Sequence, residues 1–384
     1  MRKSLNYQEV DQAADIPQIL NIFFPGKCNL QCRYCFVHKQ KEDFNEIDEH
    51  AIKSAVDIFL NYPGKKKSLS FNGGEPLLEW ELVKNIYTYA EKQARKKEVL
   101  LEGVVVTNGT LLKQEHVEFF KKYKISFRIS IDGDKKTHDK MRPFKIKNGK
   151  SSFEVILRNL QKIKFGSLQL SASLVFGPKT VTQLLDNIKF LQQQNFKYVD
   201  FYPEIYTTWR KEELVILKQE AKKIEQYYLQ LFSVKGRKTF RLSMVDKLLG
   251  SSGSGKQAIC GKIQIDAMGN FFACDKVFSL PKAVRGEYLV GNSNVGVDEK
   301  KRLQFLNNSR KELLSETGLK CETCKFKQHC ACAIGHYLYK KKTASAERDF
   351  WRSFCAVSKI LLTMNSNIIK RLEYDEFFVV LNRF

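Results

Sequence analysis

The chain has 384 residues, 43% of them hydrophobic and 28% charged, and its formal net charge is +23. This length suits two domains or one large barrel with an appendage. No stretch approaches the roughly 20 apolar residues of a membrane span, and the polar first residues do not form a signal peptide. We therefore expect a cytoplasmic protein that does not enter a membrane.

Short apolar runs alternate with amphipathic segments from residue 17 to about residue 205. Runs rich in β-branched and aromatic residues predict strands at 18–24, 68–72, 104–108, 125–131, 168–176 and 198–202. Helical patterns between them lie near 47–61, 79–96, 112–123, 152–164 and 181–193. Successive β/α units predict a parallel sheet curled into a partial barrel, whose chemistry lies on loops at the carboxyl ends of the strands.

The second half of the chain has a different pattern. Residues 206–250 are charged and helical in pattern, and GSSGSGK (250–256) is typical of a flexible linker. Cysteines crowd the sequence beyond it, and residues 345–384 predict one or two amphipathic helices. The predicted units are an N-terminal segment (1–16), the barrel (17–205), a helical bridge with linker (206–256), a cysteine-rich domain (257–364) and a helical tail (365–384).

Three cysteines lie close together in CNLQCRYC, residues 28–35, directly after the first predicted strand. A disulfide framework suits a short secreted chain. Structural zinc prefers four ligands, usually in paired units, and the next cysteine after Cys35 is Cys260. Three thiolates suit a 4Fe–4S cluster that leaves one iron open for a substrate or cofactor. The sequence therefore favours an iron–sulfur site in this loop.

CNLQCRYC resembles the CxxxCxΦC signature of the radical S-adenosylmethionine (radical SAM) enzymes, with Tyr34 as the aromatic residue. Further elements of that family follow in the right order: NGGEP (72–76), TNG (107–109), SIDG (130–133) and HDKMR (138–142). Each is plausible alone as a tight turn, but not jointly at successive strand ends. The resemblance implies a 4Fe–4S cluster on Cys28, Cys32 and Cys35 that binds S-adenosylmethionine (SAM).

The resemblance also implies the contacts to SAM. Glu75 would accept hydrogen bonds from the SAM ammonium, and the preceding glycines would let the backbone approach closely. Ser130 and Arg142 suit the SAM carboxylate. Tyr34 or Phe36 suits the adenine, although Phe36 is also consistent with a core position. The predicted cofactor-binding residues are Tyr34, Phe36, Gly73, Gly74, Glu75, Pro76, Asn108, Ser130, Asp132 and Arg142.

The seven remaining cysteines resemble the SPASM extension, which carries two auxiliary 4Fe–4S clusters on peptide- and protein-modifying radical SAM enzymes. By this resemblance the distal cluster is bound by Cys321, Cys324, Cys330 and Cys355, and the proximal cluster by Cys260, Cys274 and Cys332. The predicted fold class is therefore α/β: a partial (β/α)6 TIM-type barrel followed by a small α+β iron–sulfur (SPASM) domain.

The cysteine pattern departs from that family in two places. A single residue separates Cys330 from Cys332, where the family has three, so their assignment stays open. The residues before Cys260 contain no extra cysteine, so the proximal cluster is expected to have an open iron or a ligand other than cysteine. A zinc ribbon on the cysteines between 321 and 332 is the alternative, but it would leave the other three without a role.

Asp275 directly follows Cys274. It resembles an aspartate of the anaerobic sulfatase-maturing enzymes that acts as a base on the substrate side chain. An ordinary exposed or capping aspartate is equally consistent with the sequence, and Asp266 is a weaker candidate. We name Asp275 as the predicted catalytic residue.

The resemblance implies reductive cleavage of SAM to methionine and a 5′-deoxyadenosyl radical, followed by modification of a peptide. The main interpretation is a thioether or carbon–carbon cross-link in a ribosomally made peptide. The alternative is formylglycine formation on a protein Cys or Ser, as in sulfatase maturases. RNA modification and a non-catalytic iron–sulfur electron carrier are less favoured, because no RNA-binding module is recognisable and a carrier has no use for GGEP or SIDG.

The predicted partners are a peptide or protein substrate, an electron donor such as flavodoxin or ferredoxin, and a separate leader-binding protein, since about 16 residues precede the first strand. Lysines cluster at 39–41, 65–67 and 340–342. Such clusters attract acidic segments over long range, so we expect an acidic stretch in the substrate. A solvated lysine-rich surface without a specific role is equally consistent.

Overall fold

The computed structural model describes residues 16–24, 27–37, 47–146, 149–233, 240–242, 245, 261–316, 319–321, 323–326 and 344–372. In these ranges the strands form one mixed sheet in the order β11-β10-β9-β8-β1-β2-β3-β4-β5-β6-β7. The strands are β1 (Ile19–Phe24), β2 (Lys66–Gly73), β3 (Leu100–Thr107), β4 (Ser126–Ser130), β5 (Ser171–Phe176), β6 (Tyr198–Pro203), β7 (Arg241–Leu242), β8 (Lys262–Ile265), β9 (Asn270–Phe272), β10 (Leu289–Asn292) and β11 (Gly296–Val297).

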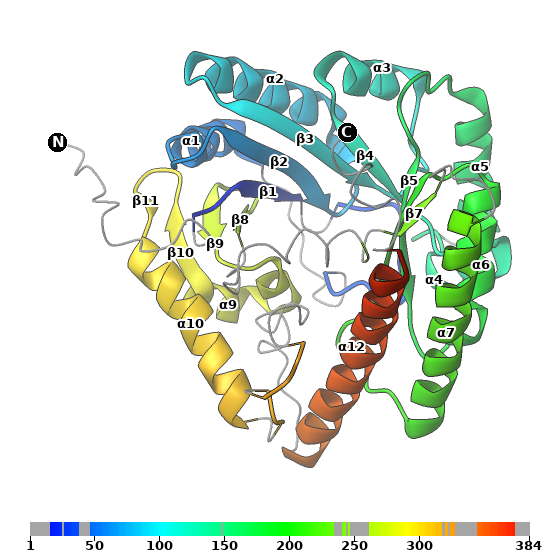
Figure 1. Ribbon diagram of the computed structural model, residues 1–384. Coiled ribbons are helices and arrows are strands. Elements are labelled where there is room, and N and C mark those ends of the chain that lie inside the picture. Colours follow the sequence, from blue (N-terminus) through cyan, green and yellow to red (C-terminus); the bar gives the residue numbers. More distant parts are fainter. Residues whose placement is uncertain are drawn as a thin grey trace.

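Crossover helices connect the parallel strands of this α/β fold. Figure 1 shows them along the outer side of the curved sheet, with α12 beside α7. The helices are α1 (Glu49–Leu60), α2 (Trp80–Lys96), α3 (Gln114–Tyr123), α4 (Lys135–Met141), α5 (Ser152–Lys162), α6 (Leu184–Gln193), α7 (Lys211–Ser233), α9 (Lys282–Arg285), α10 (Glu299–Glu316) and α12 (Ala344–Leu372), with short 3-10 turns η4 (Pro76–Glu79), η5 (Val181–Gln183), η6 (Asp275–Ser279) and η7 (Gly286–Tyr288).

All six predicted strands and all five predicted crossover helices are present, with small differences at their ends. The short helix α4 was not predicted. Its seven residues, KKTHDKM, are too polar and too few to show a periodic apolar face. Asp134 begins the helix by accepting a hydrogen bond from the Thr137 N–H at 2.8 Å.

The sheet continues across the predicted boundary between the barrel and the cysteine-rich segment. β8 pairs in parallel with β1, from Ile19 opposite Lys262 to Ile22 opposite Ile265. β9, β10 and β11 then follow in antiparallel order. At the other end of the chain, α12 runs without interruption through residue 364, where the predicted helical tail begins. The predicted linker at 250–256 lies outside the described residues.

The two faces of the sheet differ in chemistry, as side-chain alternation along a strand allows. On β1, Leu20, Ile22 and Phe24 belong to the main core beneath the helices. Asn21 lies on the opposite face, in register with Ser70 of β2 and Gln264 of β8. These three polar side chains are at most 7% exposed. The inner face is therefore polar where the outer face is apolar.

A second, smaller core lies on the inner side of the sheet. Phe23 of β1 stacks on Phe278 of η6 with ring centroids 4.2 Å apart. Val37, Phe272 and Val277 complete the cluster, and Phe36 packs against it. This core attaches the cysteine-containing loop after β1 to the segment that carries Cys274.

The lysine cluster at 65–67 is only partly a surface feature. Lys67 is 1% exposed, and its ammonium lies 4.9 Å from the centre of the Phe59 ring. Burial lowers the pKa of Lys67 to about 8. Lys67 is therefore not part of the exposed positive charge, and the attraction of an acidic substrate by this cluster stays a prediction. Lys66 is exposed and pairs with Glu102 at 2.8 Å. The cluster at 340–342 lies outside the described residues.

Candidate active site

The loop that carries Cys28, Cys32 and Cys35 follows the carboxyl end of β1 and is held by the segment after α4. The Gln31 N–H donates to the Pro143 carbonyl at 2.8 Å, and the Arg33 N–H donates to the Met141 carbonyl at 2.9 Å. An isolated bridge joins Leu30 to Phe144. These backbone bonds hold the loop against the end of α4 and the residues that follow it.

The three thiols are half-buried and influence one another electrostatically. Burial raises the pKa of Cys28 to about 11 and that of Cys32 to about 12, and the neighbouring thiols add to both shifts. Thiols in such a place become thiolates when a metal supplies positive charge. In the described parts of the chain, no three His, Cys, Asp or Glu side chains meet as ligands of a single ion. The thiols of an iron–sulfur cluster bind different irons, so three cysteines on one loop suit such a cluster.

The NGGEP segment clamps the start of the cysteine loop. The Gly74 N–H donates to the Phe24 carbonyl at 2.6 Å, and the Glu75 N–H donates to the Lys27 carbonyl at 2.7 Å. A Cβ atom on Gly74 would lie 2.0 Å from the Lys27 carbonyl oxygen. Gly73 adopts φ +109°, which favours glycine. Both glycines are therefore required by the close approach of two backbones beside Cys28.

Glu75 is fully buried and cross-links two of the predicted motifs. Its Oε1 accepts hydrogen bonds from Leu77 N–H at 3.0 Å and from the Thr107 hydroxyl at 2.6 Å, and its Oε2 accepts from Asn108 N–H at 2.6 Å. Burial raises the pKa of Glu75 to about 7, although these hydrogen bonds oppose the shift. A carboxylate has about four acceptor positions, so one on Oε2 remains for a further donor. The predicted contact with the SAM ammonium stays a prediction.

Asp132 of SIDG and Arg142 of HDKMR form a buried ion pair that contacts Tyr34 of the cysteine loop. Arg142 donates to both oxygens of Asp132, at 3.0 Å each. The Tyr34 hydroxyl donates to Asp132 Oδ2 at 2.6 Å, and the Arg142 guanidinium lies 5.2 Å from the Tyr34 ring centre. The positive charge of Arg142 lowers the pKa of Cys32, against the larger effect of burial. Ser130, at the carboxyl end of β4, is half-buried.

Asp275 lies beside Cys274 at the start of η6. Its Oδ1 is 3.8 Å from the Cys274 sulfur, and both of its carboxylate oxygens are 2.9 Å from Lys276 Nζ. Burial alone would raise the pKa of Asp275, but the charges of Lys276 and Lys262 outweigh it, and the pKa lies below its ordinary value. The Lys276 ammonium is also 4.8 Å from the centre of the Phe36 ring. Asp275 is thus an ionised carboxylate linked through Lys276 to the first cysteine loop.

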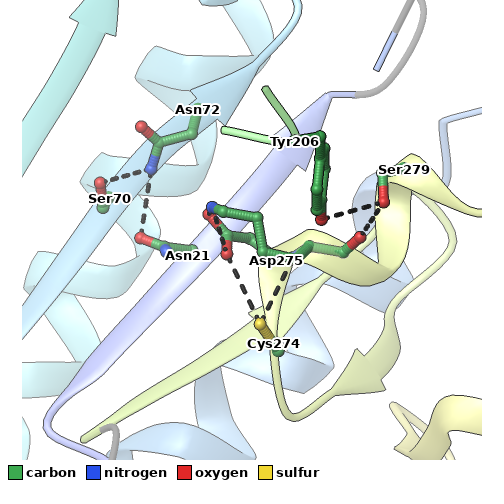
Figure 2. A network of polar contacts seen from close by, with 8 residues as sticks. Asn21, Ser70, Asn72, Tyr206, Cys274, Asp275 and Ser279 are labelled. Atoms are coloured by element: carbon green, nitrogen blue, oxygen red, sulfur yellow. Dashed lines mark hydrogen bonds and ion pairs between the residues drawn. The ribbon is translucent and has the colours of Figure 1, made fainter. Parts of the chain in front are cut away.

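The sequence did not point to Tyr206 or to the polar side chains of β1 and β2, which Figure 2 shows with Asp275. Tyr206 follows β6 with φ +62°, and its hydroxyl lies 3.2 Å from Ser279 Oγ on η6. Asn72 donates to Asn21 Oδ1 at 3.2 Å and to Ser70 Oγ at 2.7 Å. The alternation of polar and apolar residues in LSFN (69–72) was the available signal for this group. Tyr206 had no such signal, because it lies in a turn after β6, at the start of a stretch that the sequence pattern predicts to be helical.

The predicted auxiliary-cluster cysteines are described only in part. Cys274 is buried, while Cys321, Cys324 and Cys355 are half-buried. The Cys324 N–H donates to the Cys321 carbonyl at 3.1 Å, which closes a turn between them. Cys355 lies on α12. Cys260, Cys330 and Cys332 lie outside the described residues, so their predicted assignment stays a prediction.

Residues 22–202 match the Radical SAM superfamily. This region contains the cysteine loop, the glycine clamp and the buried Glu75 and Asp132 contacts described above. Residues 22–202 of the chain are therefore a radical SAM domain, as their motifs predicted. This domain indicates an enzyme that uses SAM and a 4Fe–4S cluster.

Two curated relatives illustrate the range of this similarity. The radical SAM cyclopropyl synthase TigE of Paramaledivibacter caminithermalis is 25% identical over 281 residues, 66% of this chain and 57% of TigE. The cysteine-type anaerobic sulfatase-maturating enzyme of Clostridium novyi is 26% identical over 184 residues, 46% of this chain and 48% of that enzyme. The matches thus span about half the length of these relatives.

Solved structures share the fold over a larger part of the chain. Native anSMEcpe with bound AdoMet and Cp18Cys peptide has a TM-score of 0.71 and 20% identity, and the match covers 92% of this chain and 99% of that one. Streptococcus suis SuiB bound to the precursor peptide SuiA has a TM-score of 0.53 and 14% identity, with 85% and 74% covered. At these identities the likeness concerns the fold. Among the described residues, no helix has both the length and the apolarity to cross a membrane.

Proposed function

We propose that this enzyme modifies a peptide or protein substrate after translation, with SAM and the cluster held by Cys28, Cys32 and Cys35. The observation that carries the proposal is the attachment of Asp275 to the cysteine loop through Lys276 and the inner apolar core. The peptide-bound states of anSMEcpe and SuiB, which share the fold, support a peptide as the substrate class. The parallel order β1 to β6 supports the partial (β/α)6 barrel as the frame of the site.

When bound, a 4Fe–4S cluster supplies the electron that cleaves SAM reductively. The three cysteine thiolates would hold it, and the backbone bonds of residues 31 and 33 fix their loop. Glu75 and Ser130 are the proposed contacts of the SAM amino-acid part. Arg142 is proposed to bind the SAM carboxylate while Asp132 fixes its guanidinium plane. Tyr34 and Phe36 border the loop where the adenine is proposed to lie.

Asp275 is the proposed base on the substrate side chain. After loss of a hydrogen atom, a substrate carbon next to sulfur or oxygen reaches the oxidised product by losing one more electron and a proton. Asp275 is held ionised by Lys276, so its free lone pairs can accept that proton. We further propose that residues 257–364 are a SPASM domain whose cysteines would hold two clusters, which would supply an acceptor for the electron, with flavodoxin or ferredoxin as the external donor.

The substitution Asp275→Asn tests this role. We expect the variant to form 5′-deoxyadenosine in the presence of substrate peptide but to lose the modified product, because hydrogen abstraction does not need the base. Product and 5′-deoxyadenosine are measured by mass spectrometry under anaerobic conditions. Product at the wild-type rate would show that Asp275 is structural.

Two products remain candidates within this proposal. A thioether or carbon–carbon cross-link is favoured by the absence of an extra cysteine before Cys260, since an open iron could bind a substrate thiolate. Formylglycine is favoured by Asp275 next to Cys274. Incubation with a peptide carrying a sulfatase-type Cys motif separates them. An aldehyde product establishes the second candidate, and an unmodified peptide with active SAM cleavage favours the first.

A further inference from the structure

We propose that Asn108 sets the reduction potential of the SAM-binding cluster by donating a side-chain hydrogen bond to the Cys28 sulfur. Asn108 acts through Cys28 and is therefore a positioning residue. The inference rests on the proposed function, because it requires a 4Fe–4S cluster on Cys28, Cys32 and Cys35. It gives the Asn108 side chain, which the sequence predicted only as a cofactor-binding residue, a specific chemical role.

The contact joins the ends of two neighbouring loops. Asn108 Nδ2 lies 3.8 Å from Cys28 Sγ and 2.8 Å from Asn29 Oδ1. The Leu30 N–H donates to the same sulfur at 3.4 Å. Asn108 is 6% exposed, so water does not compete strongly for its amide. Two N–H groups therefore converge on one cluster ligand in a largely dry place.

The neighbours of Asn108 fix which end of its amide faces the sulfur. Its Oδ1 accepts from Thr110 N–H at 3.0 Å and from the Thr110 hydroxyl at 2.6 Å. A backbone N–H can only donate, so the atom facing it must be the oxygen. The NH2 group is thereby directed toward Cys28 and Asn29.

Glu75 holds the backbone of Asn108 in this position. Its Oε2 accepts the Asn108 N–H at 2.6 Å, while Oε1 binds the Thr107 hydroxyl one residue earlier. Asn29 closes the network, because its amide donates to Thr110 Oγ1 at 2.8 Å. A continuous chain of hydrogen bonds thus runs from the glutamate of NGGEP through Asn108 to the Cys28 sulfur.

The direction of the effect follows from charge. Reduction adds an electron to the cluster, and part of that charge resides on the thiolate sulfurs. An N–H donor stabilises the more negative state, and the low dielectric of a buried site strengthens this stabilisation. Hydrogen bonds to cluster sulfurs are among the factors that set iron–sulfur potentials. Removing the Asn108 donor should therefore make the cluster harder to reduce.

The test compares Asn108→Leu and Asn108→Asp with wild type by anaerobic redox titration. The signal to follow is the electron paramagnetic resonance of the reduced cluster that changes on SAM addition, which separates it from auxiliary clusters. Asn108→Leu removes the donor and has nearly the same size. Asn108→Asp also removes the donor but keeps the oxygen that binds Thr110. We expect a fall of about tenfold in the reduced-to-oxidised ratio at fixed potential, equal to about 59 mV for a one-electron couple.

Asn159 provides a matched control. It supports the same loop by donating to the Gly109 and Thr110 carbonyls at 3.0 and 2.8 Å, without a bond to the sulfur. Asn159→Leu should keep the wild-type potential. An Asn108→Leu protein with full iron and an unchanged potential would overturn the proposal, and so would an equal shift in Asn159→Leu.

The titration also separates this inference from the proposed function. If the Leu variant does not retain iron, the Asp variant gives the measurement, and a wild-type potential in it overturns the proposal. If wild type itself shows no SAM-sensitive cluster signal, the proposed function fails and the inference fails with it. A wild-type signal with an unshifted variant removes the inference alone.

Discussion

The outer and inner faces of the sheet belong to the same strands but differ in role: the outer face packs against the helices, and the inner face carries polar side chains near the candidate site. On β2, Phe71 belongs to the core beneath the helices, while its neighbour Ser70 lies on the other face. The outer face is mostly apolar where the crossover helices cover it, as a sheet of crossover units requires. The inner face has Asn21, Ser70 and Gln264 in one row. Because successive side chains of a strand point to opposite faces, one strand can place core residues on one face and candidate site residues on the other.

The largest effect should come from the cysteine loop (28–35), which follows the carboxyl end of β1. Replacing Cys28, Cys32 and Cys35 together with Ala should abolish SAM cleavage, because no ligand for the SAM-binding cluster remains. Iron should fall from about 12 to about 8 per chain if two auxiliary clusters are also bound. Iron analysis and anaerobic SAM turnover measure both quantities. Wild-type iron near four per chain would contradict the two auxiliary clusters.

A pair of neighbouring substitutions on β2 compares the two faces directly. Phe71→Ala should lower the free energy of unfolding by about 3–5 kcal/mol, because it opens a cavity in the outer core. Ser70→Ala should lower it by about 0.5–1.5 kcal/mol, the typical contribution of the one hydrogen bond from Asn72 that it loses. Denaturant unfolding of both variants measures the difference. Equal losses would mean that the faces do not differ in this way.

The sequence predicted the strands, the crossover helices and the order of the motifs, because each depends on local periodicity or on residue type at a strand end. It did not predict that Glu75 binds Thr107 and Asn108, since that bond joins residues more than 30 positions apart. The buried state of Lys67 was also missed. Phe59, on α1, and Tyr62, just after it, pack against the Lys67 ammonium. A run of three lysines gives no sign that one of them is buried.

A smaller effect is expected at Glu75, which lies just after the carboxyl end of β2. Glu75→Ala should weaken SAM binding by about 1.5–3 kcal/mol, the range for a charge-assisted hydrogen bond. The substitution also leaves three buried donors without their acceptor, which loosens the loop. Isothermal titration with SAM measures the affinity, and iron content should be unchanged. Wild-type affinity would mean that NGGEP is only a turn.

The smallest effect concerns the outer surface and its positive charge. Exposed lysines contribute about 0–1 kcal/mol per ion pair, so attraction of an acidic peptide requires several together. We expect the association rate of a Glu-rich peptide to fall steeply as salt shortens the Debye length below about 10 Å. Stopped-flow binding at low and high salt gives this dependence. A flat response would assign the lysines no role in substrate capture.

The parallel pairing of β8 with β1 has a consequence for modular engineering of this enzyme. A chain cut after residue 256 loses β8, and the backbone of Ile19 to Ile22 then becomes an open sheet edge. Open edges of apolar strands recruit other chains and aggregate. A chimera that exchanges the cysteine-rich half must therefore carry its own strand with matching register to β1. A chimera of this protein should therefore be designed around the pairing of β1 with β8, and not around the predicted linker at 250–256.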